Sequence, residues 1–228
     1  MGSISLARRT VSEDQSGWQM VSICERAAAV TLFTLSLPVT LTSALAIRVL
    51  SGRTPLIAHR RIGRRGATLW MLKLRTMWGP DASSDDVCAG NGWIEYIADD
   101  HGPERKLEND PRVPGGFAQF LRRHSIDELP QLWHVISGEM SLVGPRPHAV
   151  AHDEMYRKLI EDYALRLRVF PGITGWAQIN GWRGETRDVR DMKERVRMDL
   201  WYIECWSIWL DLFILLQTPM KAFHKKAY

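Results

Sequence analysis

Cysteine is scarce in this sequence, and what little there is excludes two kinds of site. The three cysteines, Cys24, Cys88 and Cys205, are odd in number and far apart. They therefore form neither a disulfide framework nor a CxxC metal pair, and a reducing, cytosol-facing compartment fits best. Walker and dinucleotide glycine fingerprints are also missing.

Acidic residues are absent between Arg26 and Pro80, whereas basic residues are frequent there. The basic residues of this stretch are Arg48, Arg53, Arg60, Arg61, Arg64, Arg65, Lys73 and Arg75. Such a run is either a solvated face or a surface for anions, and the pI near 9.1 leaves nucleic acid, phospholipid and phosphorylated metabolites open. Because the run follows an apolar segment, a membrane surface or phosphate ligands are favoured.

The apolar segment from Ala27 to Ile47 contains 21 residues without a charge. At about 1.5 Å per residue, a helix of this length just spans a hydrocarbon core. Pro38 near its middle predicts a bend, because proline removes a backbone hydrogen bond. A signal peptide is disfavoured because no small-residue cleavage site precedes the arginines. A buried core helix is the alternative.

The rest of the 228 residues predicts one domain, mostly helical with a small β component. Residues 79–116 are rich in turn formers and predict a long surface loop with one short helix. Hydrophobic spacing predicts helices over 153–168 and from about 187 to 204. The apolar, Trp-flanked stretch 206–223 predicts an interfacial amphipathic helix.

The segment from Arg122 to Leu132 places two adjacent carboxylates after two arginines. Asp127 and Glu128 suit a helix start, as an N-cap and a first-turn acid, and this purely structural interpretation stays open. The functional interpretation is an anion site built from Arg122, Arg123 and the helix N-terminus beside a carboxylate nucleophile. Such a carboxylate forms a mixed anhydride with phosphate when a divalent cation offsets the charge repulsion.

Two further stretches suit phosphate or ligand binding. Arg146 lies between two prolines, which fixes its backbone for a bidentate contact with phosphate, although it also suits a turn cap. Residues 171–184 combine glycines, for close approach of the backbone to a ligand, with Trp side chains, Gln178 and Asn180 for stacking and hydrogen bonds. The residues alone thus indicate an anion-binding membrane protein.

Taken together, these segments resemble the bacterial sugar transferase family of monotopic polyprenyl-phosphate phosphoglycosyl transferases. The matching pieces follow one another over nearly the whole chain: the segment around Pro38, then 73–77, 109–112, 125–132, 138–147, 171–184 and 199–203. The resemblance implies that Asp127 attacks the β-phosphate of a UDP-sugar. Glu128 and Asp199 would complete an acidic cluster that holds Mg²⁺ together with Asp127.

The resemblance also implies the binding residues and partners. Arg122 or Arg123 would bind phosphates together with Arg146, while Lys73 and Arg75 would contact the phosphate donor or a lipid headgroup. The partners would be a UDP-sugar, undecaprenyl phosphate and membrane lipid, with no nucleic acid, and the chain would be a monomer or a homodimer. Residues 143–157 and 181–186 favour UDP-glucose as the donor, with UDP-galactose second.

The implied architecture is monotopic. After a flexible segment 1–20, residues 21–52 would form a re-entrant helix bent at Pro38, although Leu37 stands where family members often have serine. Residues 53–228 would form a catalytic domain with C-terminal interfacial helices, on the cytoplasmic face of a bacterial inner membrane. The competing hypotheses are a catalytically silent membrane scaffold of polysaccharide assembly and a nucleic-acid binder, which leaves the apolar ends unexplained.

Overall fold

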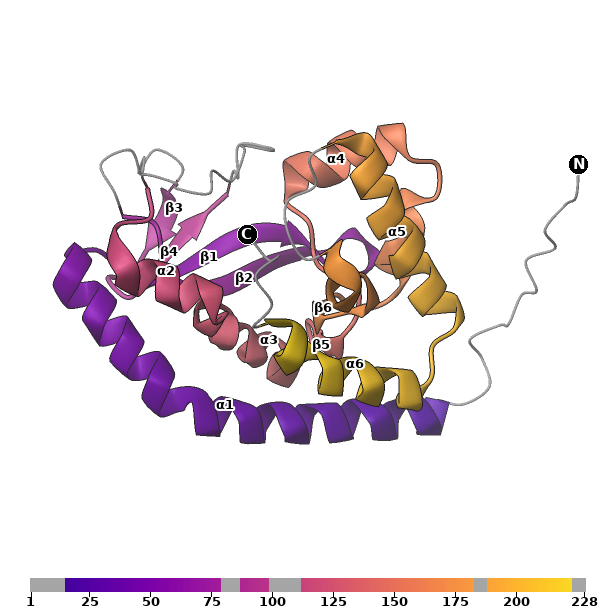
Figure 1. Ribbon diagram of the computed structural model, residues 1–228, viewed down its shortest axis with the longest axis horizontal. Helices are drawn as coiled ribbons and strands as arrows, with labels where there is room; N and C mark the ends of the chain where they lie inside the picture. The colour runs from indigo at the N-terminus through magenta and orange to yellow at the C-terminus, as the bar shows by residue number, and fades with distance from the viewer. Residues whose placement is uncertain (1–14, 79–86, 99–111, 183–187, 223–228) are drawn as a thin grey trace, which may run out of the picture.

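The structure, a computed structural model, describes residues 15–78, 87–98, 112–182 and 188–222 (Figure 1). Most described elements are helices and the strands are short, which confirms the predicted mostly helical fold with a small β component. The α-helices are α1 (Gln15–Ser51), α2 (Gly115–Arg123), α3 (Leu132–Ser137), α4 (Val150–Leu159), α5 (Val189–Glu204) and α6 (Ile208–Ala222). Tighter or wider turns form η1 (Arg64–Gly66), η2 (Ile126–Gln131), η3 (Tyr163–Arg168) and η4 (Gln178–Trp182).

Helix α1 contains the apolar segment found in the sequence and begins earlier, at Gln15. Its stretch Val21–Ser51 is long enough to cross a membrane, and its most apolar window has a mean hydropathy of 1.8 and is only 17 % buried. A buried core helix is therefore excluded. Pro38 lies inside the helix, and the Thr42 hydroxyl donates to its carbonyl oxygen at 2.7 Å.

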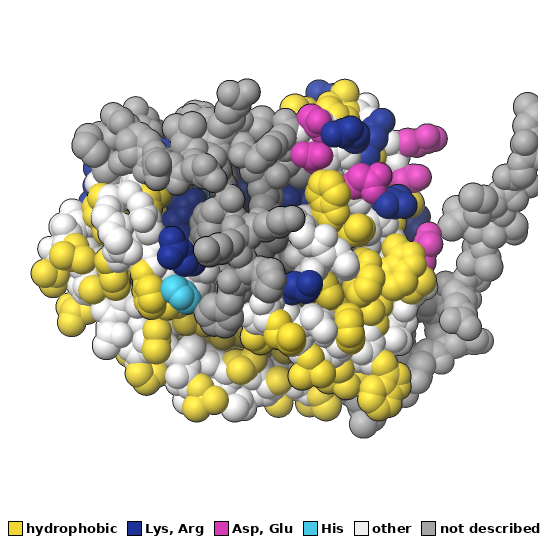
Figure 2. Space-filling model, in the orientation of Figure 1, with side chains coloured by type: hydrophobic (Ala, Val, Ile, Leu, Met, Phe, Trp, Pro, Cys, Tyr) yellow, Lys and Arg dark blue, Asp and Glu magenta, His cyan; other side chains and the backbone are white. Residues whose placement is uncertain are grey.

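Both halves of α1 pack on the rest of the chain, one on each side of Pro38. Ala29 lies in the central core with Ile214 of α6, while Ala44 and Ile47 pack against Leu121 of α2 in a second cluster. Helix α1 accordingly curves along the lower side of the molecule, and hydrophobic side chains cover the lower face over α1 and α6 (Figures 1 and 2). The most exposed large hydrophobic side chains of α1 are Ile23, Leu35, Leu41, Leu45, Val49 and Leu50.

The sheet is larger than the sequence suggested. Strand β1 (Leu56–Ile62) pairs antiparallel with β2 (Thr68–Leu74) and parallel with β4 (Ile94–Ile97), and β3 (Val87–Gly90) completes the order β2-β1-β4-β3. The prediction of a loop over 79–116 was therefore wrong for β3 and β4. Each has four residues, which is too short for an alternating pattern to stand out.

The helix predicted over 153–168 is two elements. Helix α4 ends at Leu159, because Ile160 has an extended backbone conformation (φ −129°, ψ 115°) that interrupts the helix. The short helix η3 follows. Tyr156, Ile160 and Tyr163 nevertheless bury their side chains in one cluster, so helical spacing persists across the break. Helices α5 and α6 confirm the other two predicted helices, and the interfacial position of α6 stays a prediction.

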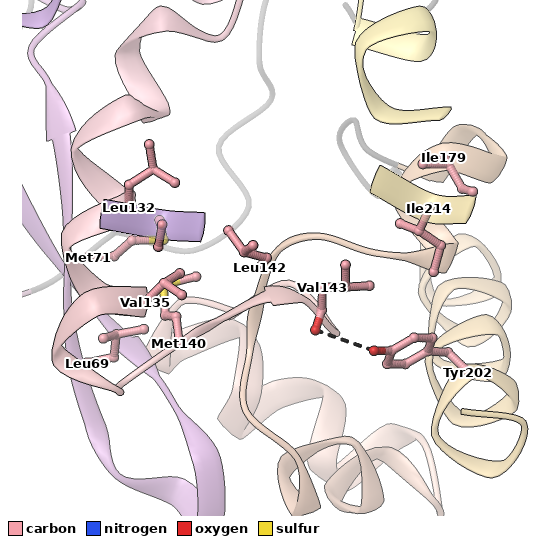
Figure 3. Close-up of a cluster of buried hydrophobic side chains, with 11 residues drawn as sticks. Leu69, Met71, Leu132, Val135, Met140, Leu142, Val143, Ile179, Tyr202 and Ile214 are labelled. Carbon is pink, nitrogen blue, oxygen red and sulfur yellow. Dashed lines mark hydrogen bonds between the residues drawn. The ribbon is translucent and has the colours of Figure 1, made fainter. Parts of the chain in front are cut away.

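A two-stranded parallel sheet joins β5 (Ser141–Val143) to β6 (Gly172–Thr174). A Cβ atom at Gly172 would lie 2.1 Å from the backbone nitrogen of Gly144, so the glycine allows these strands to approach. At Gly172, the close approach that the sequence predicted to a ligand is therefore an approach to the backbone of Gly144. In Figure 3, Leu142 and Val143 lie between the α3 side and Tyr202, whose hydroxyl donates to the Val143 carbonyl at 3.4 Å.

Candidate active site

The acidic pair lies in the first turn of η2, directly after the sharp turn that joins this element to α2. Ser125 takes a left-handed conformation (φ 57°) as the N-cap residue of η2, which places Asp127 and Glu128 in the first turn. The alternative that Asp127 serves as the N-cap is therefore wrong. Helix η2, which carries the pair, packs against both β2 and the apolar helix α1.

Asp127 is a buried carboxyl group with an altered acidity. Asp127 is 9 % exposed. Its pKa is raised to about 6, mainly because the carboxyl group is buried and to a smaller extent because Glu128 places a second negative charge beside it. The positive charges of Lys73, Arg122 and Arg146 act in the opposite direction. Asp127 thus titrates closer to neutral pH than an ordinary carboxyl group, which is typical of functional carboxylates.

Arg146 follows β5 and contacts the second carboxylate of the pair. Its guanidinium donates to both carboxylate oxygens of Glu128, from Nη2 and, at 3.5 Å, from Nη1. Glu128 raises the pKa of Arg146 further above its usual range. The Arg146 guanidinium thus makes a bidentate contact with a carboxylate, and its predicted contact with phosphate stays a prediction.

Of the predicted binding residues, Lys73, Arg122 and Arg146 lie around Asp127. Lys73 of β2 is half-buried. Burial is the larger cause and the positive charge of Arg61 the next one that lowers the pKa of Lys73, while Glu128 and Asp127 act to raise it. Arg122, in the last turn of α2, is half-buried and interacts electrostatically with Asp127. Arg123 is exposed. The structure thus brings Lys73, Arg122 and Arg146 together around the acidic pair.

Arg75 is not brought to the acidic pair. It is buried, and its Nε donates to the Thr54 carbonyl at 2.8 Å while Nη2 binds the Thr54 hydroxyl and Glu95. This arginine therefore ties the end of β2 to β4. Its predicted contact with phosphate or lipid stays untested.

Gln178 and Asn180 make local contacts in η4. The Gln178 amide donates to the Ile173 carbonyl at 3.1 Å, and its Oε1 is buried without a hydrogen-bond partner. Asn180 is exposed and donates to the Trp176 carbonyl at 2.9 Å. The ring of Trp176 packs on Trp201, with 4.7 Å between centroids.

Asp199 lies apart from the other two predicted metal ligands in its contacts. Its Oδ2 accepts from Arg166, at 3.1 Å from Nε and 2.9 Å from Nη2. Within the described parts of the chain, no three His, Cys, Asp or Glu side chains gather closely enough to hold a metal. Asp127 and Glu128 alone still suit Mg²⁺, because this ion commonly binds one or two carboxylates together with substrate phosphates.

Comparison with known proteins places this site in a family. A model of the family described as bacterial sugar transferase matches residues 18–225. The chain belongs to the bacterial sugar transferase family. Because the matched region includes the acidic pair, Arg146 and α1, the resemblance found in the sequence is confirmed.

Relatives with assigned reactions include glucose and galactose enzymes. The UDP-glucose:undecaprenyl-phosphate glucose-1-phosphate transferase of Escherichia coli K12 is 44 % identical over 90 % of this chain and 41 % of that protein. The Caulobacter vibrioides protein of the same name is 43 % identical over 84 % of this chain and 65 % of its own length. The undecaprenyl-phosphate galactose phosphotransferase of Salmonella typhimurium LT2 is 36 % identical over 73 % of this chain and 33 % of that protein.

This bacterial sugar transferase chain spans about two fifths of the E. coli relative. Of the motifs that carried the resemblance, 109–111 and 183–186 lie outside the described residues. Sequence reasoning missed Arg166, the partner of Asp199. Arg166 gave no signal in the sequence, because it lies within 153–168, where the hydrophobic spacing predicts an ordinary amphipathic helix.

Proposed function

We propose that this chain transfers hexose-1-phosphate from a UDP-sugar to undecaprenyl phosphate, with glucose-1-phosphate as the favoured group. The observation that carries the proposal is the buried Asp127 carboxyl group beside Glu128, faced by Lys73, Arg122 and Arg146. Cations around a carboxylate suit an anionic diphosphate, which would otherwise be repelled. The names of the E. coli, Caulobacter and Salmonella relatives support the two substrate classes.

The proposed reaction has two displacements at one phosphorus atom. An oxygen of Asp127 attacks the β-phosphorus of the UDP-sugar, the bond to the bridging oxygen breaks, and UMP leaves with that oxygen. The resulting mixed anhydride holds the sugar phosphate on Asp127. A phosphate oxygen of undecaprenyl phosphate then attacks the same phosphorus, which frees the carboxylate and yields the lipid diphosphate sugar.

Each neighbour of Asp127 has a task that follows from its charge. Arg146 holds Glu128 through a bidentate contact, and Lys73 and Arg122 bring positive charge to the incoming phosphates. Asp127 and Glu128 would hold Mg²⁺, which neutralises phosphate charge when bound. Arg122 and Lys73 keep the diphosphate oriented, so that Asp127 lies in line with the leaving oxygen.

The proposed membrane arrangement is monotopic, on the cytoplasmic face of the bacterial inner membrane. Helix α1 would enter and leave on one side, bent at Pro38, and residues 53–228 would form the catalytic domain. The support is that Ala29 and Ile47, on opposite sides of Pro38, both pack on this domain. The exposed Trp209 and Leu216 of α6 extend the apolar face, which supports contact of α1 and α6 with the membrane surface.

Cysteine labelling tests this arrangement. In a cysteine-free background, native Cys24 alone and an Arg48→Cys variant alone place one thiol at each end of the apolar part of α1, both at exposed positions. A membrane-impermeant maleimide should label neither variant in spheroplasts and both in inverted vesicles. Labelling of either thiol from the outside would show a spanning helix.

The reaction itself is tested by UMP release. Detergent-solubilised protein is given UDP-glucose, UDP-galactose and other UDP-sugars, with undecaprenyl phosphate and Mg²⁺. We expect UMP from one UDP-hexose and loss of the activity in EDTA, restored by Mg²⁺. Folded protein that releases no UMP from any sugar would favour the silent scaffold, and activity that survives chelation would remove the metal from the proposal.

The pH dependence should follow Asp127. Only the carboxylate form is a nucleophile, so kcat/KM for UMP release should fall as the pH drops below about 6. Glu128→Gln removes the like charge that helps to raise this pKa, and the acidic limb should therefore move to lower pH. An acidic limb that stays in place in Glu128→Gln, measured with matched protein amounts, would contradict the assigned coupling.

A further inference from the structure

The backbone around Arg146 has few hydrogen-bond donors. Pro145 and Pro147 on either side carry no N–H group, so this segment is held mainly through its carbonyl oxygens. The Pro145 carbonyl accepts from the Gly172 N–H at 3.0 Å, and the His148 carbonyl accepts from the Ile62 N–H at 3.0 Å. These two anchors lie on either side of Arg146.

The carbonyl of Arg146 itself is held by a side chain. Nη2 of Arg166, in η3, donates to this oxygen at 2.6 Å. The same guanidinium binds Asp199 of α5 through Nε and Nη2, and its Cζ lies 5.4 Å from the centre of the Tyr163 ring. The side chains of Arg166 and Asp199 are 2 % and 4 % exposed. Arg166 is therefore fixed from both sides before it reaches Arg146.

We propose that Arg166 and Asp199 are positioning residues for the phosphoryl transfer: together they hold the Arg146 backbone so that its guanidinium stays on Glu128. The chain of contacts runs from Asp199 to Arg166, from Arg166 to the Arg146 carbonyl, and from the Arg146 guanidinium to Glu128. The catalytic consequence rests on the proposed function, whereas the positioning of the backbone does not.

This role differs from metal binding and from simple stabilisation. Oδ2 of Asp199 already accepts two donors from Arg166, and within the described residues it joins no metal-holding group. A buried ion pair adds little net stability compared with apolar residues, because both charges lose their hydration. The pair does fix the direction of a third group, the Arg146 carbonyl. A bidentate contact such as that of Arg146 depends on this fixed direction.

The first test follows the backbone by hydrogen exchange. Asp199→Asn leaves a side chain of the same size with a weaker hold on Arg166. Arg166→Lys keeps the charge but provides one nitrogen, which cannot serve Asp199 and the Arg146 carbonyl in the present geometry. Amides in the peptide 141–150 should exchange at least tenfold faster in either variant, and if Asp199→Asn fails to fold, Arg166→Lys decides.

Glu95→Gln is the matched control, because it weakens another buried contact between a carboxylate and an arginine, that with Arg75. In this variant the peptide 141–150 should exchange as in the wild type. Unchanged exchange in a folded Arg166→Lys or Asp199→Asn protein would overturn the proposal, whether or not the wild type releases UMP. An equal increase in Glu95→Gln would overturn it as well, because the effect would then be general.

The second test is a double-mutant cycle on UMP release. Asp199→Asn should lower kcat about tenfold in the wild type but less than threefold in an Arg146→Lys background, because the two residues act through one contact. The Mg²⁺ concentration for half-maximal activity should stay within twofold. A full tenfold loss in both backgrounds, or a raised Mg²⁺ requirement, would show that Asp199 acts independently of Arg146, as a metal ligand would.

Discussion

Asp127→Asn is expected to abolish turnover in a protein that still folds and still sediments with membranes. Asparagine has the shape of aspartate, but its amide does not form the mixed anhydride with phosphate. The loss should be on the order of a thousandfold or more in kcat, as for nucleophiles that act as a unit with their neighbours. Turnover within a few fold of the wild type would remove Asp127 from the role of nucleophile.

The same substitution should make the protein more stable at neutral pH. Because the pKa of Asp127 is about 6 in the fold, above its ordinary value of 3.8, folding favours the protonated form. Its stabilising contribution is full below about pH 4 and is lost as the pH rises through 6. At pH 8 the wild type therefore carries a cost that asparagine avoids, on the order of 3 kcal/mol.

Thermal unfolding of the wild type and Asp127→Asn at pH 8 and pH 4 checks this sign. We expect a higher Tm for the variant at pH 8 and equal values at pH 4. A variant that melts below the wild type at pH 8 would mean that the carboxylate stabilises the fold, contrary to its burial next to Glu128.

Arg146→Gln is expected to have the second largest effect. The variant loses the bidentate contact with Glu128 and one of the positive charges near Asp127. We expect UMP release to fall at least a hundredfold, because charge stabilisation at a transferring phosphoryl group is a large catalytic contribution. The free energy of unfolding should also fall by about 2 kcal/mol, since the half-buried Glu128 carboxylate loses its two hydrogen bonds from Arg146.

Two variants separate these effects. The double variant Glu128→Gln/Arg146→Gln removes both charges, so its stability should recover while its activity stays low. Arg197→Gln breaks an exposed pair between Arg197 and Glu194 on α5 and should change neither quantity appreciably. If the double variant is as unstable as Arg146→Gln alone, the loss of stability comes from packing of the arginine stem rather than from the hydrogen bonds that the Glu128 carboxylate loses.

The parts of the site that could be predicted from sequence are those with a local signal. Asp127 and Glu128 are adjacent in the chain, and the prolines around Arg146 restrict its backbone visibly in the sequence. Helix α1 could be predicted because an uncharged segment of this length has few other structures. These features require no knowledge of which segments meet in space.

The remaining features depend on contacts between distant segments. Arg166 and Asp199 are 33 positions apart, and Arg75 at the end of β2 meets Glu95 of β4 across β1, so neither pair leaves a local pattern. The resemblance therefore grouped Asp199 with the acidic pair, while the structure places it against Arg166. Strands β3 and β4 were missed for a related reason, since the pairing of β4 with β1 and of β3 with β4, rather than their own sequence, keeps them extended.

The intact mass of the protein after exposure to UDP-glucose, without undecaprenyl phosphate, tests the central claim most directly. We predict that the mass of the wild type rises by one hexose phosphate group with release of about one equivalent of UMP, as covalent catalysis requires. Asp127→Asn should stay unmodified, and added undecaprenyl phosphate should remove the group from the wild type. Wild-type protein that gains no mass, yet releases UMP once the lipid phosphate is added, would contradict the covalent intermediate and show a direct transfer.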